Sequence, residues 1–129
     1  MLKKTIHFFE KNKKLSVVLI IIVLGVMWYC SSIPGGSLKI VTFNWMPTLY
    51  HLVIFFSFSF LLLMIISKNE IKAKRIIITI TISLFVAILD EFHQSFVPGR
   101  DSNIKDILID LTGVITSQLL CLIPKKHIQ

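Results

Sequence analysis

The run DEFHQSFVPGR at residues 90–100 constrains how this chain can fold, because it directly follows fourteen uncharged residues, 76–89. Fourteen helical residues rise only about 21 Å, at about 1.5 Å each, whereas the hydrocarbon core of a bilayer is about 30 Å thick. Before the turn at Pro98 and Gly99, such a helix must carry four polar side chains to the lipid boundary: Asp90, Glu91, His93 and Gln94. Ionisable side chains at membrane depth are costly and therefore indicate a functional site.

The composition excludes an ordinary soluble domain. Hydrophobic residues make up 54% of the 129 residues and charged residues 16%, and the mean hydropathy is +0.79. Soluble domains carry about 25% charged residues. The net charge of +7 does not indicate a nucleic-acid partner, because the positive charges form short blocks beside apolar runs. We therefore expect one small integral membrane domain over residues 1–129, with the lipid bilayer as its partner and an oligomeric state that the sequence leaves open.

Four apolar runs predict an all-α bundle of four transmembrane helices. The first begins like a signal peptide, but Trp28 and Tyr29 stand where a cleavage site needs small residues, so we expect an uncleaved anchor. Pro47 is suited to the first turn of the second helix. The expected helices cover about 15–32, 47–66, 75–97 and 103–123.

The distribution of basic residues predicts the orientation. Eleven of the fourteen Lys and Arg residues lie in the first fourteen residues, in the segment 68–75 or at the C-terminal end, and three lie in the other two loops. Loops rich in Lys and Arg stay in the cytoplasm. We therefore expect a multi-pass protein of the cell membrane with both termini cytoplasmic and the segment 90–100 at the outer face.

Helical spacing predicts two polar stripes that face each other. On the third helix, four residues point in nearly one direction at 100° per residue: Thr79, Ser83, Asp90 and Gln94. On the fourth helix a stripe of small and polar residues matches it: Asp106, Asp110, Gly113 and Ser117. The carboxylates of the two helices would then meet below the outer surface, where like charges repel and require cations or shared protons.

These side chains suggest either proton transfer or ligand binding. We assign acid/base or polar-site roles to Asp90, Glu91 and His93, and ligand-binding roles to a second set: His51, Gln94, Arg100, Asp106 and Asp110. Structural alternatives stay open for several of them. Arg100 suits an anionic group but also a lipid phosphate or Asp101 at the interface. His51 can simply bond a neighbouring helix, and Asp106 and Asp110 can stabilise the start of the fourth helix.

No cofactor is required by these residues. Asp90, Glu91, His93 and His51 are possible ligands of a divalent ion, but no spacing matches a known zinc pair, so we assign no metal site. The sequence contains no glycine-rich phosphate loop and no Cys-x-x-Cys pair. Cys30 and Cys121 are expected at opposite membrane faces and therefore as free thiols.

The same residues resemble the signature of the VanZ-like membrane proteins. The similarity covers the run 90–100, then Asp106 and the run DLTG at 110–113, and it extends to SSIP at 31–34 and to His51. The founding member of that family is associated with resistance to the glycopeptide teicoplanin. The resemblance implies a role in antibiotic resistance or in homeostasis of the cell envelope.

Three hypotheses follow for the function. The first is a protein that acts at the outer leaflet on a lipid-linked or cell-envelope component. The second is an intramembrane hydrolase or transferase on a phospholipid or polyprenyl-phosphate headgroup, so whether the chain is an enzyme stays open. The third is a structural partner subunit of an envelope complex.

Overall fold

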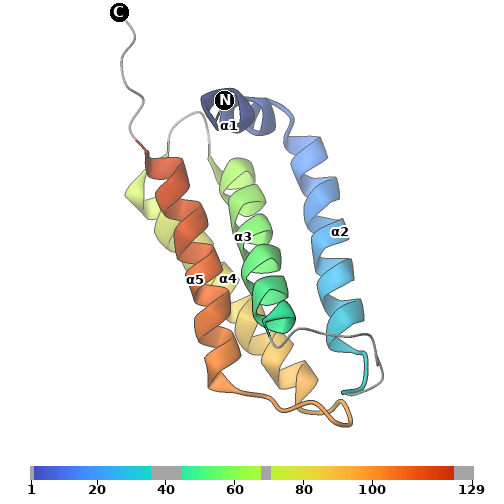
Figure 1. Cartoon of the computed structure of the whole chain (residues 1–129). Coiled ribbons are helices and arrows are strands. Elements are labelled where there is room, and N and C mark those ends of the chain that lie inside the picture. The colour runs from blue at the N-terminus through green and yellow to red at the C-terminus, as the bar shows by residue number, and fades with distance from the viewer. Residues whose placement is uncertain (1, 36–44, 68–70, 124–129) are drawn as a thin grey trace, which may run out of the picture.

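The computed structural model describes residues 2–35, 45–67 and 71–123, and within these segments it consists of helices and their connections (Figure 1). The helices are α1 (Leu2–Lys11), α2 (Lys13–Ser31), α3 (Met46–Ile66), α4 (Ala73–Gln94) and α5 (Ile104–Leu122). The predicted all-α architecture is therefore confirmed. Three of the helices, α2, α3 and α4, are long and apolar enough to cross a membrane. α5 has 19 residues but carries Lys105, Asp106 and Asp110 near its start.

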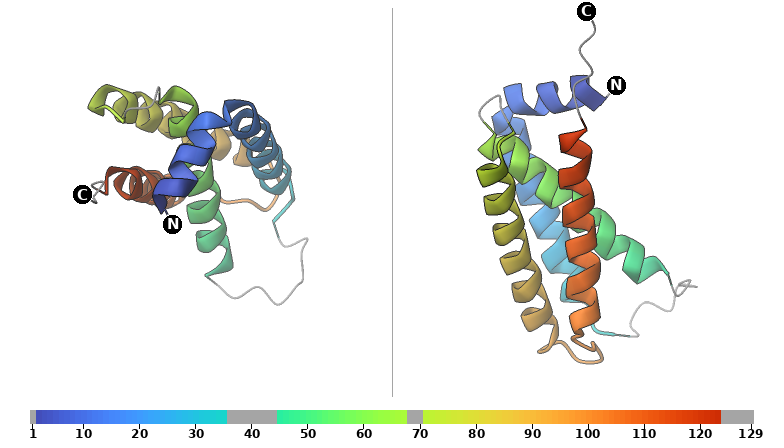
Figure 2. Two further views of the ribbon diagram at one scale, coloured as in Figure 1. Left: turned by 90° about the horizontal axis from the view of Figure 1, so that it is seen from above. Right: turned by 90° about the vertical axis from the view of Figure 1, so that its left-hand side faces the viewer.

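α3 is the central element of the bundle. It packs against all four other helices and makes its most extensive contact with α5, and it crosses the bundle obliquely (Figure 2). At this crossing the backbones approach closely, because a Cβ atom added to Gly113 would lie 2.5 Å from the carbonyl oxygen of Leu52. Small residues allow such close approach between membrane helices. The crossing brings the start of α3 beside the first half of α5.

α1 was not expected from the sequence, which predicted only a basic tail before the first span. The helix lies across one end of the bundle (Figures 1 and 2). Its Ile6 is buried in a cluster with Leu63, Met64 and Cys121. The hydroxyl of Ser67 donates to the Glu10 carboxylate at 2.7 Å, which also ties α1 to the end of α3. This end of the molecule is closed by apolar packing.

The observed helix ends differ from the expected ones at one important place. α4 ends at Gln94 rather than near residue 97. The next amides bond three residues back, Phe96 to the His93 carbonyl and Val97 to the Gln94 carbonyl. This tighter winding leads into the turn at Gly99, whose φ of 72° suits glycine. At the start of α5, the Asn103 side chain caps the helix by accepting the amide of Lys105 at 3.0 Å.

Many polar side chains lie inside the bundle, and many large apolar ones are exposed on its outside. Buried polar residues include Ser59, Thr79, Ser83 and Gln118, whereas residues such as Ile21, Ile77 and Leu119 are exposed. A soluble domain has the opposite distribution. Together with the three apolar helices, this distribution indicates a multi-pass membrane protein. Cys30 and Cys121 are free, as expected.

Candidate functional site

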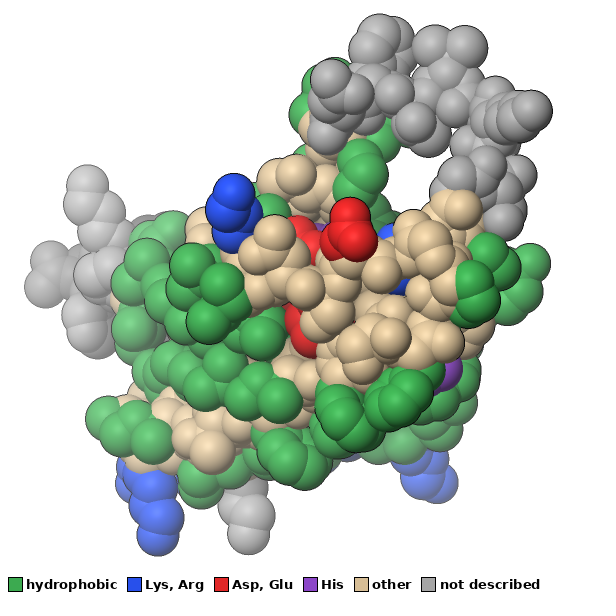
Figure 3. Space-filling view, turned by 90° about the horizontal axis from the view of Figure 1, so that it is seen from below, with side chains coloured by type: hydrophobic (Ala, Val, Ile, Leu, Met, Phe, Trp, Pro, Cys, Tyr) green, Lys and Arg blue, Asp and Glu red, His purple; other side chains and the backbone are tan. Residues whose placement is uncertain are grey.

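The two predicted stripes both lie inside the bundle and run along it, with their acidic residues at the end opposite α1 (Figure 1). On α4, Thr79, Ser83, Asp90 and Gln94 are buried, and on α5 so are Asp110, Gly113 and Ser117. Asp106 is half-buried at the start of α5. α4 and α5 pack directly against each other. Seen from below, acidic side chains lie in the middle of this end, within a rim of hydrophobic side chains (Figure 3).

Asp90 joins α4 to the end of α2. Its carboxylate accepts the Ser31 hydroxyl at 2.6 Å through one oxygen and the Gln94 amide at 2.9 Å through the other. The side chain is 1% exposed. A buried carboxylate is costly unless hydrogen bonds compensate it, and Ser31 and Gln94 supply that compensation. Gln94, predicted as a ligand-binding residue, therefore holds Asp90 in place.

His51 forms a buried pair with Asp110. The distance between His51 Nδ1 and Asp110 Oδ1 is 2.9 Å, and both residues are buried, so the pair joins α3 to α5. The other oxygen of Asp110 is buried without a hydrogen-bond partner in the described segments. Asp90, Glu91 and Asp106 all lie within electrostatic reach of His51. His51 thus bonds Asp110 and interacts electrostatically with Asp90, Glu91 and Asp106, and we call these four carboxylates the acidic cluster.

Glu91 connects α4 to the segment before α5. One of its carboxylate oxygens accepts the backbone amide of Asn103 at 2.9 Å. The other oxygen is buried and, among the described residues, has no hydrogen-bond partner. Such an oxygen is an available acceptor for a group that enters the site.

His93 faces α2 from the edge of the acidic cluster. Its ring stacks on Trp28, with centroids 4.0 Å apart and an interplanar angle of 24°. Its Nε2 lies 3.0 Å from the Ser32 hydroxyl. The helical spacing placed His93 beside the stripe of α4, and the structure assigns it partners on α2.

Arg100 is directed at the backbone of α2. Its Nε donates to the Ile33 carbonyl at 3.0 Å and its Nη2 donates to the Cys30 carbonyl at 2.6 Å. These carbonyls lie at and just beyond the C-terminal end of α2, where a cation is favourable. Neither alternative considered from the sequence, an anionic ligand or an interfacial pair with Asp101, included this contact.

The model of the VanZ/LLP1 family matches residues 4–125. The chain belongs to the VanZ/LLP1 family. No curated protein and no solved structure is significantly similar to it.

In this VanZ/LLP1 chain, two polar contacts and one buried hydroxyl were not predicted from the sequence. Ser31 was noted only as part of the SSIP run, and it proves to be a partner of Asp90. Tyr50, beside His51, has a buried hydroxyl without a hydrogen-bond partner in the described part of the chain. Gln118 donates to the Ser59 hydroxyl at 2.6 Å, deeper in the bundle. The partners are 59 residues apart both in the Ser31–Asp90 pair and in the Ser59–Gln118 pair, so helical spacing could not predict either contact.

The site of this VanZ/LLP1 protein is rich in acceptors. The acidic cluster contacts one buried imidazole, that of His51, and the guanidinium of Arg100 donates to carbonyl oxygens. Within the described segments, no group of three or more His, Cys, Asp or Glu side chains is arranged to hold a metal ion. The arrangement can exchange protons between His51 and a carboxylate, and it can accept hydrogen bonds from a donor group.

Proposed function

We propose that this VanZ/LLP1-family protein binds a lipid-linked or cell-envelope component at the outer leaflet, so that glycopeptides such as teicoplanin engage their targets less well. In this proposal the protein spans the cell membrane four times, with both termini in the cytoplasm. The acidic cluster, His51 and the neighbouring His93 form the binding site, and Arg100 positions the end of α2 beside it.

The topology is supported by charge and length. Eleven of the fourteen basic residues lie within 1–14, 68–75 or 124–129 of the sequence, and by the positive-inside rule we expect these segments in the cytoplasm. α5 is about 28 Å long at about 1.5 Å per residue, close to the thickness of the hydrocarbon core. Its buried residues face α3 and α4, so its carboxylates are shielded from lipid.

One observation carries the proposal: His51 pairs with the buried Asp110 of α5 and interacts electrostatically with the buried Asp90 of α4, at one end of an apolar bundle. Ionisable groups inside a membrane protein usually mark a functional site. Asp110 and Glu91 each retain a buried oxygen that no described residue satisfies. A purely structural network would satisfy its acceptors.

The proposal is tested by neutralising the cluster with little change of shape. We expect Asp90→Asn and Glu91→Gln to abolish any teicoplanin tolerance that the wild-type protein confers on a susceptible bacterial host, at equal membrane abundance. Asp101→Asn is the matched control, because Asp101 is an exposed acid outside the cluster. Full tolerance in both cluster variants would refute the proposal.

A hydrolase or transferase acting on a phospholipid or polyprenyl-phosphate headgroup is the second candidate, and the His51–Asp110 pair favours it. An imidazole oriented by a carboxylate is the usual form of a general base. Purified protein in lipid would be incubated with each substrate, with and without divalent metal, and products would be quantified. Turnover that His51→Gln eliminates would establish the enzyme, whereas no turnover in any condition would leave the binding function.

A further inference from the structure

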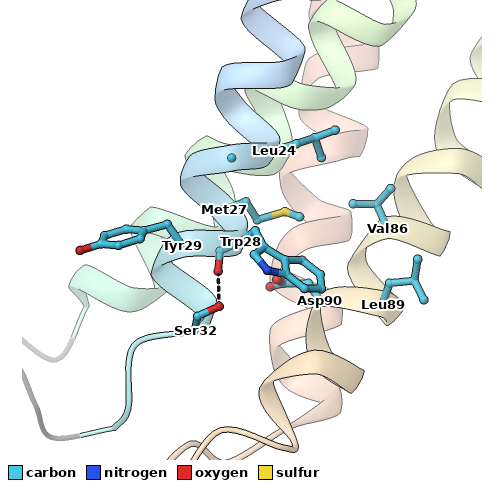
Figure 4. Close-up of a pocket in the computed structure, with 9 residues that line it drawn as sticks. Leu24, Met27, Trp28, Tyr29, Ser32, Val86, Leu89 and Asp90 are labelled. Atoms are coloured by element: carbon cyan, nitrogen blue, oxygen red, sulfur yellow. Dashed lines mark hydrogen bonds between the residues drawn. The ribbon is translucent and has the colours of Figure 1, made fainter.

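A groove of about 620 Å³ runs between α2 and α4 beside the acidic cluster (Figure 4). The groove is open because α2 packs mainly against α3 and contacts α4 at few positions. Its walls are apolar, with Leu24 and Met27 on α2 and Val86 and Leu89 on α4. The volume lies within the range of about 300–1,000 Å³ that is typical of pockets for small ligands.

Gly25 lines the groove and places no side chain in it. A Cβ atom added there would meet no other atom within 4 Å. Glycine lowers helix stability by roughly 0.5–1 kcal/mol relative to alanine, and here no close packing contact requires it. The absence of a side chain at Gly25 therefore leaves space in the apolar groove. A hydrocarbon chain can occupy this space.

One end of the groove is polar. Ser32 and Asp90 line it together with Trp28, which reaches from α2 toward α4 (Figure 4). A carboxylate has about four lone-pair sites, and Ser31 and Gln94 use two of those of Asp90. Asp90 lines the groove with only 1% of its surface exposed, so its remaining lone pairs can accept hydrogen bonds only from a small donor group at the end of the groove. An apolar channel that ends at a carboxylate is complementary to an amphiphile.

The charges near the polar end of the groove indicate which lipid headgroup would bind there. The acidic cluster attracts cations, and Arg100 donates to the carbonyl oxygens of Cys30 and Ile33 and so is not directed at a ligand in the groove. We propose that the groove holds one hydrocarbon chain of a membrane lipid whose headgroup bears an ammonium group, and that this ammonium donates hydrogen bonds to Asp90. The inference rests on the proposed function and names the class of its ligand.

Trp28 provides a direct readout, since the chain has two tryptophans and Trp45→Phe leaves Trp28 as the single one. The Trp45→Phe protein would be reconstituted in phosphatidylcholine with rising fractions of a lipid brominated in its chains. We expect brominated phosphatidylethanolamine to quench Trp28 at a mole fraction about tenfold lower than brominated phosphatidylcholine, the effect of one charge-assisted hydrogen bond. Equal quenching by the two lipids would overturn the inference.

Two variants separate the chain from the headgroup. Gly25→Leu fills the groove and should remove the preference, whereas Val26→Leu, on an exposed position outside the groove, should retain it. Asp90→Asn should make the two lipids equally effective, because the ammonium loses its charged partner. A preference that persists in both Gly25→Leu and Asp90→Asn would place the lipid elsewhere and refute the proposal.

The outcome is distinguishable from that of the proposed function. A lipid preference that depends on Gly25 and Asp90, in a protein whose Asp90→Asn and Glu91→Gln variants both keep full teicoplanin tolerance, would uphold the lipid site and reject the proposed function. Tolerance that requires Asp90, in a protein that quenches equally with both lipids, would reject the lipid site alone.

Discussion

At the residue scale, the buried pair of His51 and Asp110 shows what helical spacing can and cannot indicate. The spacing of Asp106, Asp110 and Gly113 indicated the buried face of α5, because one side of a helix must pack inside the bundle. The partner could not be predicted, since His51 lies 59 residues away and the pair depends on how α3 crosses α5. The contacts of Arg100 could not be predicted either, because its acceptors are backbone carbonyls, which every residue has.

The pair makes a prediction about stability. Asp110→Ala leaves the imidazole of His51 buried without its acceptor, and an unsatisfied buried partner costs about 1–3 kcal/mol. Asp110→Asn keeps an amide oxygen at the same place and should cost less. Thermal unfolding in detergent would measure both variants. Equal melting temperatures for wild type and Asp110→Ala would show that the hydrogen bond contributes nothing to stability.

Arg100 makes a prediction about local order. In Arg100→Ala the Cys30 and Ile33 carbonyls lose charge-assisted hydrogen bonds, each worth about 1.5–3 kcal/mol. Amide hydrogen exchange in the last turn of α2 should therefore accelerate. Lys105→Ala, which removes an exposed cation at the same end, should leave that exchange unchanged. Unchanged protection in Arg100→Ala would show that Arg100 does not hold α2.

At the element scale, the apolar runs predicted the approximate positions of α2 to α5, but they did not predict α1. The first fourteen residues carry five lysines, which suggested a solvated tail. Their helix is stabilised by Ile6, which packs on Leu63 and Met64 of α3. Helices of about ten residues are marginal in isolation, so this one depends on tertiary contacts that no local pattern reveals.

The α3–α5 crossing is tested by a pair of glycine substitutions. Gly113→Ala would place a methyl group 2.5 Å from the Leu52 carbonyl, so the helices must separate, at a cost of about 1–3 kcal/mol or more. Gly25→Ala is the control, because its methyl group would meet nothing within 4 Å. The melting temperature should fall for the first variant alone. Similar values for the two variants would contradict the close approach.

At the scale of the whole molecule, the proposed orientation predicts which face each end occupies. In a protein with Cys30→Ser and Cys121→Ala, single cysteines would be introduced as Asp101→Cys and Lys11→Cys, both at exposed positions. A membrane-impermeant thiol reagent applied to intact cells should label Asp101→Cys, and Lys11→Cys should react only after the membrane is permeabilised. The reverse pattern would place the acidic cluster on the cytoplasmic side.

The connection after α2 contacts the connection after α4, and this contact restricts which amino acids are tolerated at two exposed glycines. The Gly35 amide donates to the Pro98 carbonyl at 3.0 Å, and a Cβ atom on Gly35 would collide with the Gly99 carbonyl oxygen. Both glycines are exposed, where saturation mutagenesis normally recovers many amino acids. Here a selection for membrane abundance should return glycine at both codons, and epitope tags or circular permutation sites inserted at either position should fail.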